Sequence, residues 1–157
     1  APSGTEKTFL IKLILTNVRQ NGDIVLAVAS SRIVATLLSG ERTAHCNFKL
    51  PLNLVAPEAH SCNISKRSDQ GQILRWCTLI IWHECTMAHR GGLEGLDRAL
   101  RDIQDSQASI GSATLLLSGD FRQTFPVIPK GMREDEVQAC LKSSPLWCHI
   151  TTCYPLI

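Results

Sequence analysis

Residues 117–126 read LSGDFRQTFP, an apolar run that changes abruptly into a glycine, an acid and a polar pair. With the residues before it, the run predicts a buried strand over Ala113–Ser118 that ends at Gly119-Asp120. Polar groups just beyond a buried strand are typical of ligand sites in α/β proteins. The stretch therefore directs attention to the ends of the other strands.

Two more apolar runs have the length of buried strands, Ile24–Ala29 and Thr78–Trp82. Helical spacing and capping residues predict helices at 7–20, 31–38, 44–48, 72–76, 93–103 and 134–141, with further strands at 124–128 and 149–154. Residues 39–68 otherwise read as irregular. This alternation predicts a parallel sheet with helices on both faces and a ligand site at the carboxyl ends of the strands.

The composition fits one globular domain, with 157 residues, of which 44% are hydrophobic and 19% charged. A net charge of +2 with interspersed signs says nothing about partners. Seven cysteines without a CxxC pair favour neither a disulfide framework nor a zinc ribbon, and they fit a reducing compartment. No apolar run reaches the roughly 20 residues of a membrane span and no signal peptide is visible, so we expect a soluble intracellular protein.

The N-terminal segment 3–8, SGTEKT, is similar to a damaged phosphate-binding loop. Lys7 and Thr8 supply the lysine and hydroxyl of the pattern G-x-x-x-x-G-K-[ST], but Ala1 and Glu6 stand where its glycines belong. A side chain at a loop glycine strains the backbone, and the Glu6 carboxylate would repel phosphate unless it points outward. Without the other segments, a plain helix N-terminus explains these residues equally well.

Residues 79–84, LIIWHE, have the apolar strand of a magnesium-binding motif that normally ends in Asp-Glu. Glu84 can act as the base for water, whereas His83 is a poor magnesium ligand because this cation favours oxygen donors. In the opening stretch, the Gln123 amide is placed to contact a γ-phosphate or the attacking water, and Asp120 to lie near the metal or a DNA path. The alternative reading there is a capped strand followed by a turn.

In this order and at these separations, the three segments resemble the first motor domain of Pif-type (petite integration frequency) ATP-dependent DNA helicases, especially the copies associated with Helitron transposons in plants. The resemblance extends through residues 26–31, 42–45, 48–51, 84–87 and 141–147. It implies a P-loop NTPase (RecA-like) three-layer α/β domain with a mainly parallel sheet. Residues 1–157 would then form one partial domain, without the strand before the phosphate loop and without the second motor domain.

The resemblance also implies roles for individual residues, with ATP and Mg²⁺ as cofactors and single-stranded or forked DNA as partner. The implied sets are Gly4, Thr5, Lys7 and Thr8 for nucleotide, Thr8 and Glu84 for magnesium, Glu84, Asp120 and Gln123 for catalysis, and Ser30, Ser31, Thr43 and His45 for the DNA backbone. The family moves 5′ to 3′ and serves repair, recombination and telomere maintenance, which implies a nuclear or mitochondrial location. Read without the family, the four DNA residues are helix caps or loop residues.

Three departures from the family, Glu6, His83 and Arg32, suggest a decayed copy with impaired catalysis. The alternative is an inactive remnant that at most binds single-stranded DNA. A third reading is a metal-binding module built from His83, Cys85, His89, Cys148, His149 and Cys153. Three tryptophans, Trp76, Trp82 and Trp147, are predicted to lie in the core.

Overall fold

The computed structural model describes residues 6–37, 42–51, 53–54, 62–122, 126–128 and 131–153 of the chain. Four parallel strands form its sheet in the order β2-β1-β3-β4. Their bounds are β1 Ile24–Ala29, β2 Arg42–Thr43, β3 Cys77–His83 and β4 Thr114–Ser118. The parallel sheet expected from the sequence is confirmed. The two-residue β2 falls in a stretch that the sequence indicated to be irregular.

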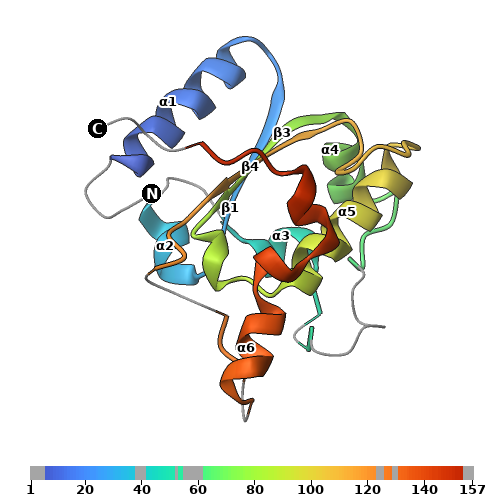
Figure 1. Ribbon diagram of the computed structural model, residues 1–157. Helices are drawn as coiled ribbons and strands as arrows, with labels where there is room; N and C mark the ends of the chain where they lie inside the picture. The colour runs from blue at the N-terminus through green and yellow to red at the C-terminus, as the bar shows by residue number, and fades with distance from the viewer. Residues whose placement is uncertain are drawn as a thin grey trace.

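One face of the sheet is covered by helix α1, Lys7–Gln20, which begins where the sequence predicted. Ile11 and Leu15 of α1 pack against Val25 and Ala27 of β1 and against Ile81 of β3. The helix stops at a turn in which Gly22 has a φ of 82°, a conformation that glycine adopts without strain. Figure 1 shows α1 on one side of the sheet and α4 and α5 on the other.

The opposite face carries the larger core, beneath α3 (Ala44–Phe48), α4 (Asp69–Trp76) and α5 (Arg90–Ile103). Alternate residues of the strands point to this face, because successive side chains of a strand lie on opposite sides. Its largest buried side chain, Trp82, packs against Phe48 with ring centroids 5.8 Å apart. The large side chains of α5 that are fully buried there are Leu93, Leu96, Leu100 and Ile103. The three-layer arrangement is thus confirmed.

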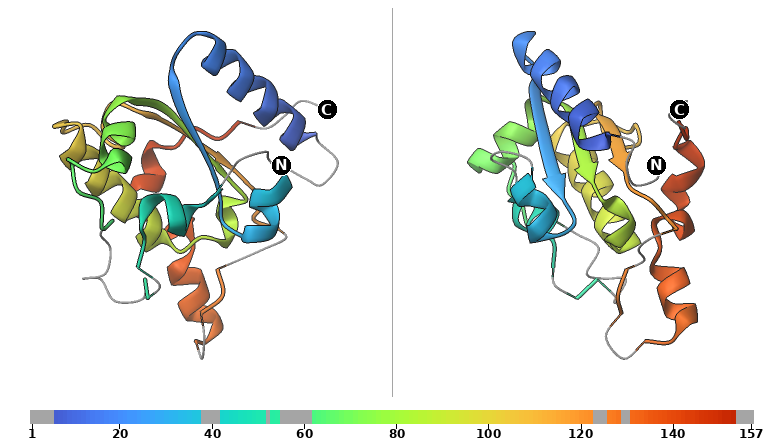
Figure 2. Two further views of the ribbon diagram at one scale, coloured as in Figure 1. Left: turned by 180° about the vertical axis from the view of Figure 1, so that it is seen from behind. Right: turned by 90° about the vertical axis from the view of Figure 1, so that its left-hand side faces the viewer.

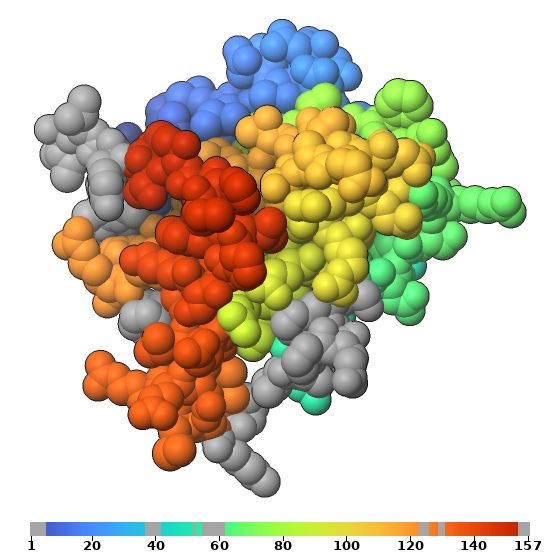
Figure 3. All heavy atoms as spheres, turned by 45° about the vertical axis from the view of Figure 1, so that its right-hand side comes forward, coloured from blue at the N-terminus to red at the C-terminus, as the bar shows by residue number. Residues whose placement is uncertain are grey.

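In the described part of the chain, the remaining elements are the short helix α2 (Arg32–Leu37), the helix α6 (Arg133–Ala139) and the 3₁₀ turns η2 (Cys85–Met87), η3 (Leu141–Ser143) and η4 (Pro145–His149). Leu146 and Trp147 pack against the larger core. Figure 2 shows the C-terminal segment in red on the same side of the sheet as α5, and Figure 3 shows its atoms alongside those of the yellow helix.

Two strand predictions near the C-terminus are wrong for the residues that the structure describes. Residues 150–153 form no strand, and Cys148 and His149 belong to η4. This turn begins at Pro145 behind a Ser144 cap, so Leu146 and Trp147 reach the core from a helical turn rather than by alternation. Residues 126–128 are also outside the sheet, where Pro126 lacks the N–H that a ladder requires. Residues 124–125 lie outside the described ranges.

The tryptophan predictions hold for two of the three residues. Trp82 is buried and Trp147 packs on the core, whereas Trp76, the last residue of α4, is 67% exposed. Within the described ranges, no helix combines the length and the apolar character that a membrane crossing requires.

Candidate functional site

The candidate site lies along one edge of the sheet, where four strands end in register. Thr43 pairs with Ala29, Ala29 with His83, and His83 with Ser118. Because all four strands are parallel, the residues that follow this row emerge at the carboxyl edge of the sheet. Glu84, Ser30 and Gly119-Asp120 are such residues, so the structure brings the predicted segments to one edge.

At the centre of this edge, Lys7 meets Glu84. The Lys7 Nζ atom lies 3.4 Å from Glu84 Oε1, although 77 positions separate the two residues in the chain. Their side chains keep 18% and 22% of their surface exposed, so the pair is accessible to a ligand. Glu84 has a φ of 50°, a left-handed conformation that costs free energy in a residue with a side chain. The strand end therefore turns sharply to hold this carboxylate beside the lysine.

His83, the last residue of β3, is only 4% exposed. Its Nδ1 atom lies 4.0 Å from Glu84 Oε1, and among the described residues neither ring nitrogen has a hydrogen-bond partner. Burial lowers the pKa of His83, the Glu84 carboxylate raises it and the Lys7 ammonium lowers it. A buried polar group without a partner is unfavourable for folding, so this imidazole is the least satisfied polar side chain of the edge.

The end of β4 approaches the turn after Glu84 very closely. A Cβ added to Gly119 would lie 2.8 Å from Thr86 Cγ2, a distance that side chains do not adopt. The glycine in the opening stretch is therefore required for close packing between β4 and η2. Asp120 is buried, and its Oδ1 accepts a hydrogen bond of 3.0 Å from the Arg122 amide. In this structure Asp120 thus has the turn-capping role of the alternative reading.

The residues predicted to contact DNA lie at the same edge, and three of them have structural partners. Ser31 Oγ accepts a bond from the Val34 amide at the start of α2, and Thr43 Oγ1 accepts one from the Cys46 amide at the start of α3. Ser30 Oγ accepts a bond of 3.0 Å from Trp82 Nε1, which the sequence did not indicate. Only the pairing of β1 with β3 could have revealed that bond. His45 is half-buried, and burial lowers its pKa.

The start of α1 shows how the altered phosphate-loop position is accommodated. Glu6 stands before the helix with a φ of 49°, the left-handed region that favours glycine, and its side chain is exposed. Thr8 lines a hollow of about 530 Å³ together with Glu6, Phe9 and Lys12. Gly4, Thr5 and Gln123 lie outside the described residues, so their predicted roles remain predictions.

The structure does not support the metal-binding module of the third reading. Among the described residues, no three His, Cys, Asp or Glu side chains gather around a common point. His89 Nδ1 accepts a bond of 3.0 Å from the Gly91 amide and caps α5. Cys85 is buried, and burial raises the pKa of its thiol to about 12, which opposes the thiolate that a metal needs. All seven cysteines are unbridged.

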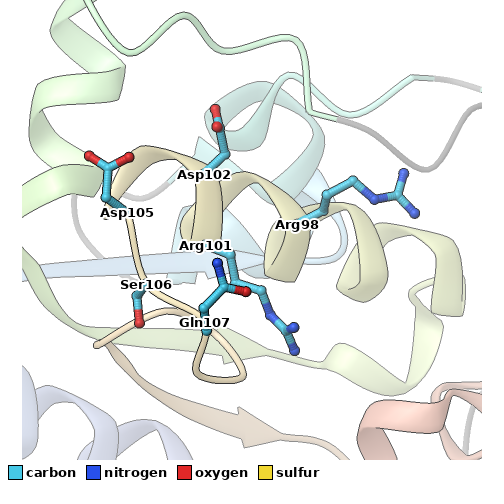
Figure 4. Close-up of a pocket in the computed structure, with 6 residues that line it drawn as sticks. All are labelled: Arg98, Arg101, Asp102, Asp105, Ser106 and Gln107. Carbon is cyan, nitrogen blue, oxygen red and sulfur yellow. The ribbon is translucent and has the colours of Figure 1, made fainter.

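A second hollow, of about 490 Å³, lies at the C-terminal end of α5 (Figure 4). Arg98, Arg101 and Asp102 of the helix line it, with Asp105, Ser106 and Gln107 of the following loop. A helix of 14 residues is about 20 Å long, and α5 starts shortly after Glu84. This hollow is therefore remote from the carboxyl edge and plays no part in the site.

The fold and this edge define a class of protein. A lysine at the start of a helix, paired with a carboxylate that follows a buried parallel strand, is the arrangement of nucleoside-triphosphate-binding α/β domains. Comparison with known proteins gives the particular family, because the model for PIF1-like helicases matches residues 2–156.

Individual relatives agree with this match. ATP-dependent DNA helicase PIF4 of Trypanosoma brucei brucei is 29% identical over 125 residues, which are 77% of this chain and 15% of that protein. The crystal structure of Bacteroides Pif1 bound to single-stranded DNA is 24% identical, with a TM-score of 0.74 over 92% of this chain and 34% of that chain. Bacteroides Pif1 in complex with ADP-AlF3 and single-stranded DNA is 24% identical, with a TM-score of 0.68 over 83% of this chain and 31% of that one.

The chain therefore belongs to the PIF1-like helicase family, and its fold is that of the RecA-like domain in Pif1 structures. It spans about a third of the length of these structures and a smaller share of the trypanosome protein.

Proposed function

We propose that this chain is the ATP-binding part of the first motor domain of an ATP-dependent DNA helicase. The observation that carries the proposal is the ion pair between Lys7 and Glu84 at the carboxyl edge. Family membership supports it, as does the structure of Bacteroides Pif1 in complex with ADP-AlF3 and single-stranded DNA.

In this proposal the two partners of the ion pair separate when nucleotide binds. Lys7 moves its ammonium from the Glu84 carboxylate to the outer phosphates, where the positive N-terminal end of α1 also favours negative charge. Glu84 is then free to accept a proton from the water that attacks the γ-phosphate.

The magnesium ion that the family implies is only partly matched by the residues present. The Thr8 hydroxyl and the Glu84 carboxylate are suitable oxygen donors. His83 is not, because it directs a nitrogen donor toward Glu84 in the position where the motif has an aspartate. The donor set therefore does not fit Mg²⁺, and the roles of Lys7 and Glu84 above do not depend on this cation.

We extend the proposal to DNA along the same edge. Single-stranded DNA would cross the ends of β1 and β2, where Thr43 ends β2 and Ser30, Ser31 and His45 follow the strands. Hydroxyl groups and short helix starts suit phosphate contacts that carry no sequence information. The complete helicase would move 5′ to 3′ on single-stranded or forked DNA in nuclear repair, recombination and telomere maintenance.

Nucleotide binding is tested with the purified chain and a fluorescent ATP analogue. Lys7→Ala should weaken binding by about tenfold or more, because a charge-assisted contact to phosphate is lost. Lys66→Ala is the matched control, since Lys66 also forms ion pairs, with Asp102 and Asp105, but at the remote end of α5. Equal affinity in the Lys7→Ala variant and the unaltered chain would refute the proposal.

A second candidate function is DNA binding without ATP turnover. The observation that favours it is the strained, acidic Glu6 at the start of α1, which opposes phosphate. It predicts binding of an oligonucleotide that ATP does not alter and that salt weakens steeply. Fluorescence anisotropy at several salt concentrations, with and without ATP, distinguishes the two functions: a nucleotide-dependent affinity favours the motor domain.

A further inference from the structure

His83 has the environment of a ligand whose partner is not part of the protein. It ends β3 between Ala29 and Ser118, is 4% exposed, and has two ring nitrogens without hydrogen-bond partners among the described residues. Proteins rarely bury an imidazole in this way, because each unpaired nitrogen loses its bond to water. A bound cation would supply the missing partner.

The distance to Glu84 suits such a cation. His83 Nδ1 and Glu84 Oε1 are 4.0 Å apart. Bonds from one metal ion to imidazole nitrogen and carboxylate oxygen are each about 2.1 Å long, so an ion can reach both donors with little movement. Mixed nitrogen and oxygen donors suit Zn²⁺ and Co²⁺ better than Mg²⁺, which keeps to oxygen.

Lys7 makes this site dependent on nucleotide. Its ammonium lies 3.4 Å from the same Oε1 atom, so a divalent cation beside Glu84 would meet a positive charge. Phosphates remove this conflict, because they draw Lys7 away and supply oxygen donors to the ion. The cation should therefore bind together with the nucleotide and poorly without it.

We propose that His83 and Glu84 bind Zn²⁺ or Co²⁺ jointly with the phosphates of the nucleotide, so that this chain prefers the complex of such a cation over the Mg²⁺ complex. The proposal rests on the nucleotide binding proposed above. It assigns the departure at His83 to a changed metal preference rather than to loss of the site.

The test measures binding of the fluorescent ATP analogue with Co²⁺, with Mg²⁺ and with EDTA. In the unaltered chain, Co²⁺ should support binding about tenfold more tightly than Mg²⁺, since the imidazole coordinates only the former. In the His83→Asp variant, the affinity for the analogue with Co²⁺ should equal the affinity with Mg²⁺ or fall below it. His149→Gln is the matched control, because His149 is exposed on η4 and should leave the ratio unchanged.

The visible absorption of Co²⁺ gives a second readout that does not depend on activity or on the folding of a variant. The ternary mixture of chain, nucleotide and Co²⁺ should show a spectrum changed by nitrogen coordination, which chain and Co²⁺ without nucleotide should lack. An unchanged spectrum in the unaltered chain would overturn the proposal, even if His83→Asp failed to fold.

The outcomes separate the two proposals. The metal preference would be overturned if the ratio of the affinity with Co²⁺ to the affinity with Mg²⁺ were the same in the unaltered chain and in a folded His83→Asp variant. If binding still depended on Lys7 in that case, the proposed nucleotide site would stand. Absence of nucleotide binding with every cation, in both proteins, would overturn the proposed function itself.

Discussion

The two ends of α5 differ in how well their polar groups are satisfied. In its C-terminal half, the buried Asp97 accepts bonds from Arg101 Nε and from the Ile110 backbone amide, and just beyond its end Gln104 Nε2 donates to the Leu74 carbonyl at 2.8 Å. Near its N-terminal end, at the tip of β3, neither ring nitrogen of the buried His83 has a hydrogen-bond partner among the described residues.

This contrast separates the packed part of the molecule that serves stability, called the frame below, from the candidate site at the carboxyl edge of the sheet. Where charges, amides and backbone groups are paired, the sequence serves stability, and departures from that rule gather where a ligand completes the structure. The same edge contains Glu6 and Glu84, two of the three acids with a left-handed backbone among the described residues, and the pair of Lys7 with Glu84; the third acid, Asp105, follows α5. The predictions below test whether removal of groups at the two regions has opposite effects.

The largest effect is expected in the frame. Leu96→Ala should lower the free energy of unfolding by about 2–5 kcal/mol, because Leu96 is fully buried in the larger core and its truncation leaves a cavity. Leu13→Ala, at a residue that is 52% exposed on α1, should change it by less than about 0.5 kcal/mol. Urea unfolding followed by circular dichroism measures both, and similar losses would contradict the burial pattern.

The next effect concerns the paired acid of α5. Asp97→Ala should lower the free energy of unfolding by about 1–3 kcal/mol, because the Ile110 amide and Arg101 lose their common acceptor. Asp102→Ala is the matched control on the same helix, since its side chain is 70% exposed and pairs only at the surface with Lys66. Equal unfolding midpoints for the two variants would show that the Asp97 bonds do not hold the loop after α5.

At the site, removal of a polar group should not lower the free energy of unfolding. His83→Leu should leave the free energy of unfolding unchanged or raise it by about 1 kcal/mol, because an apolar side chain replaces a buried imidazole that has no hydrogen-bond partner among the described residues. His89→Leu should instead cost about 1 kcal/mol, because it removes the bond that caps α5. A clear loss of stability in His83→Leu would mean that the imidazole serves the frame.

Much of the frame could be predicted because its signals are local. The bounds of β1 and α3 match the apolar run 24–29 and the helix 44–48 that follows the Thr43 cap. The strand β2 could not be predicted, since two residues carry no pattern and its existence depends on pairing with Val28 and Ala29. Trp76 was expected in the core but ends α4 with 67% exposure, while the adjacent Cys77 is buried at the start of β3.

The site could be predicted only in part, because only some of its features have local signals in the sequence. Motif spacing was enough to single out Lys7 and Glu84, which the structure places in contact, while their roles in a nucleotide site stay predictions. The missing partners of His83 and the bond from Trp82 to Ser30 depend on packing between distant segments, which no local pattern encodes. The sequence could identify Glu6 as a departure, whereas its left-handed backbone required the structure.

The smallest effect on stability is expected at Glu6, where two substitutions separate backbone strain from charge. Glu6→Gly should raise the free energy of unfolding by about 0.5–1 kcal/mol, since glycine adopts a φ of 49° without the cost that other residues incur, less its greater freedom in the unfolded chain. Glu6→Gln keeps the strain and removes only the charge, so its stability should not change. Both variants should bind the fluorescent ATP analogue more tightly, because the carboxylate that repels phosphate is gone. Tighter binding by Glu6→Gly alone would assign the defect of this loop to its backbone, and tighter binding by neither would place the exposed carboxylate away from the phosphates.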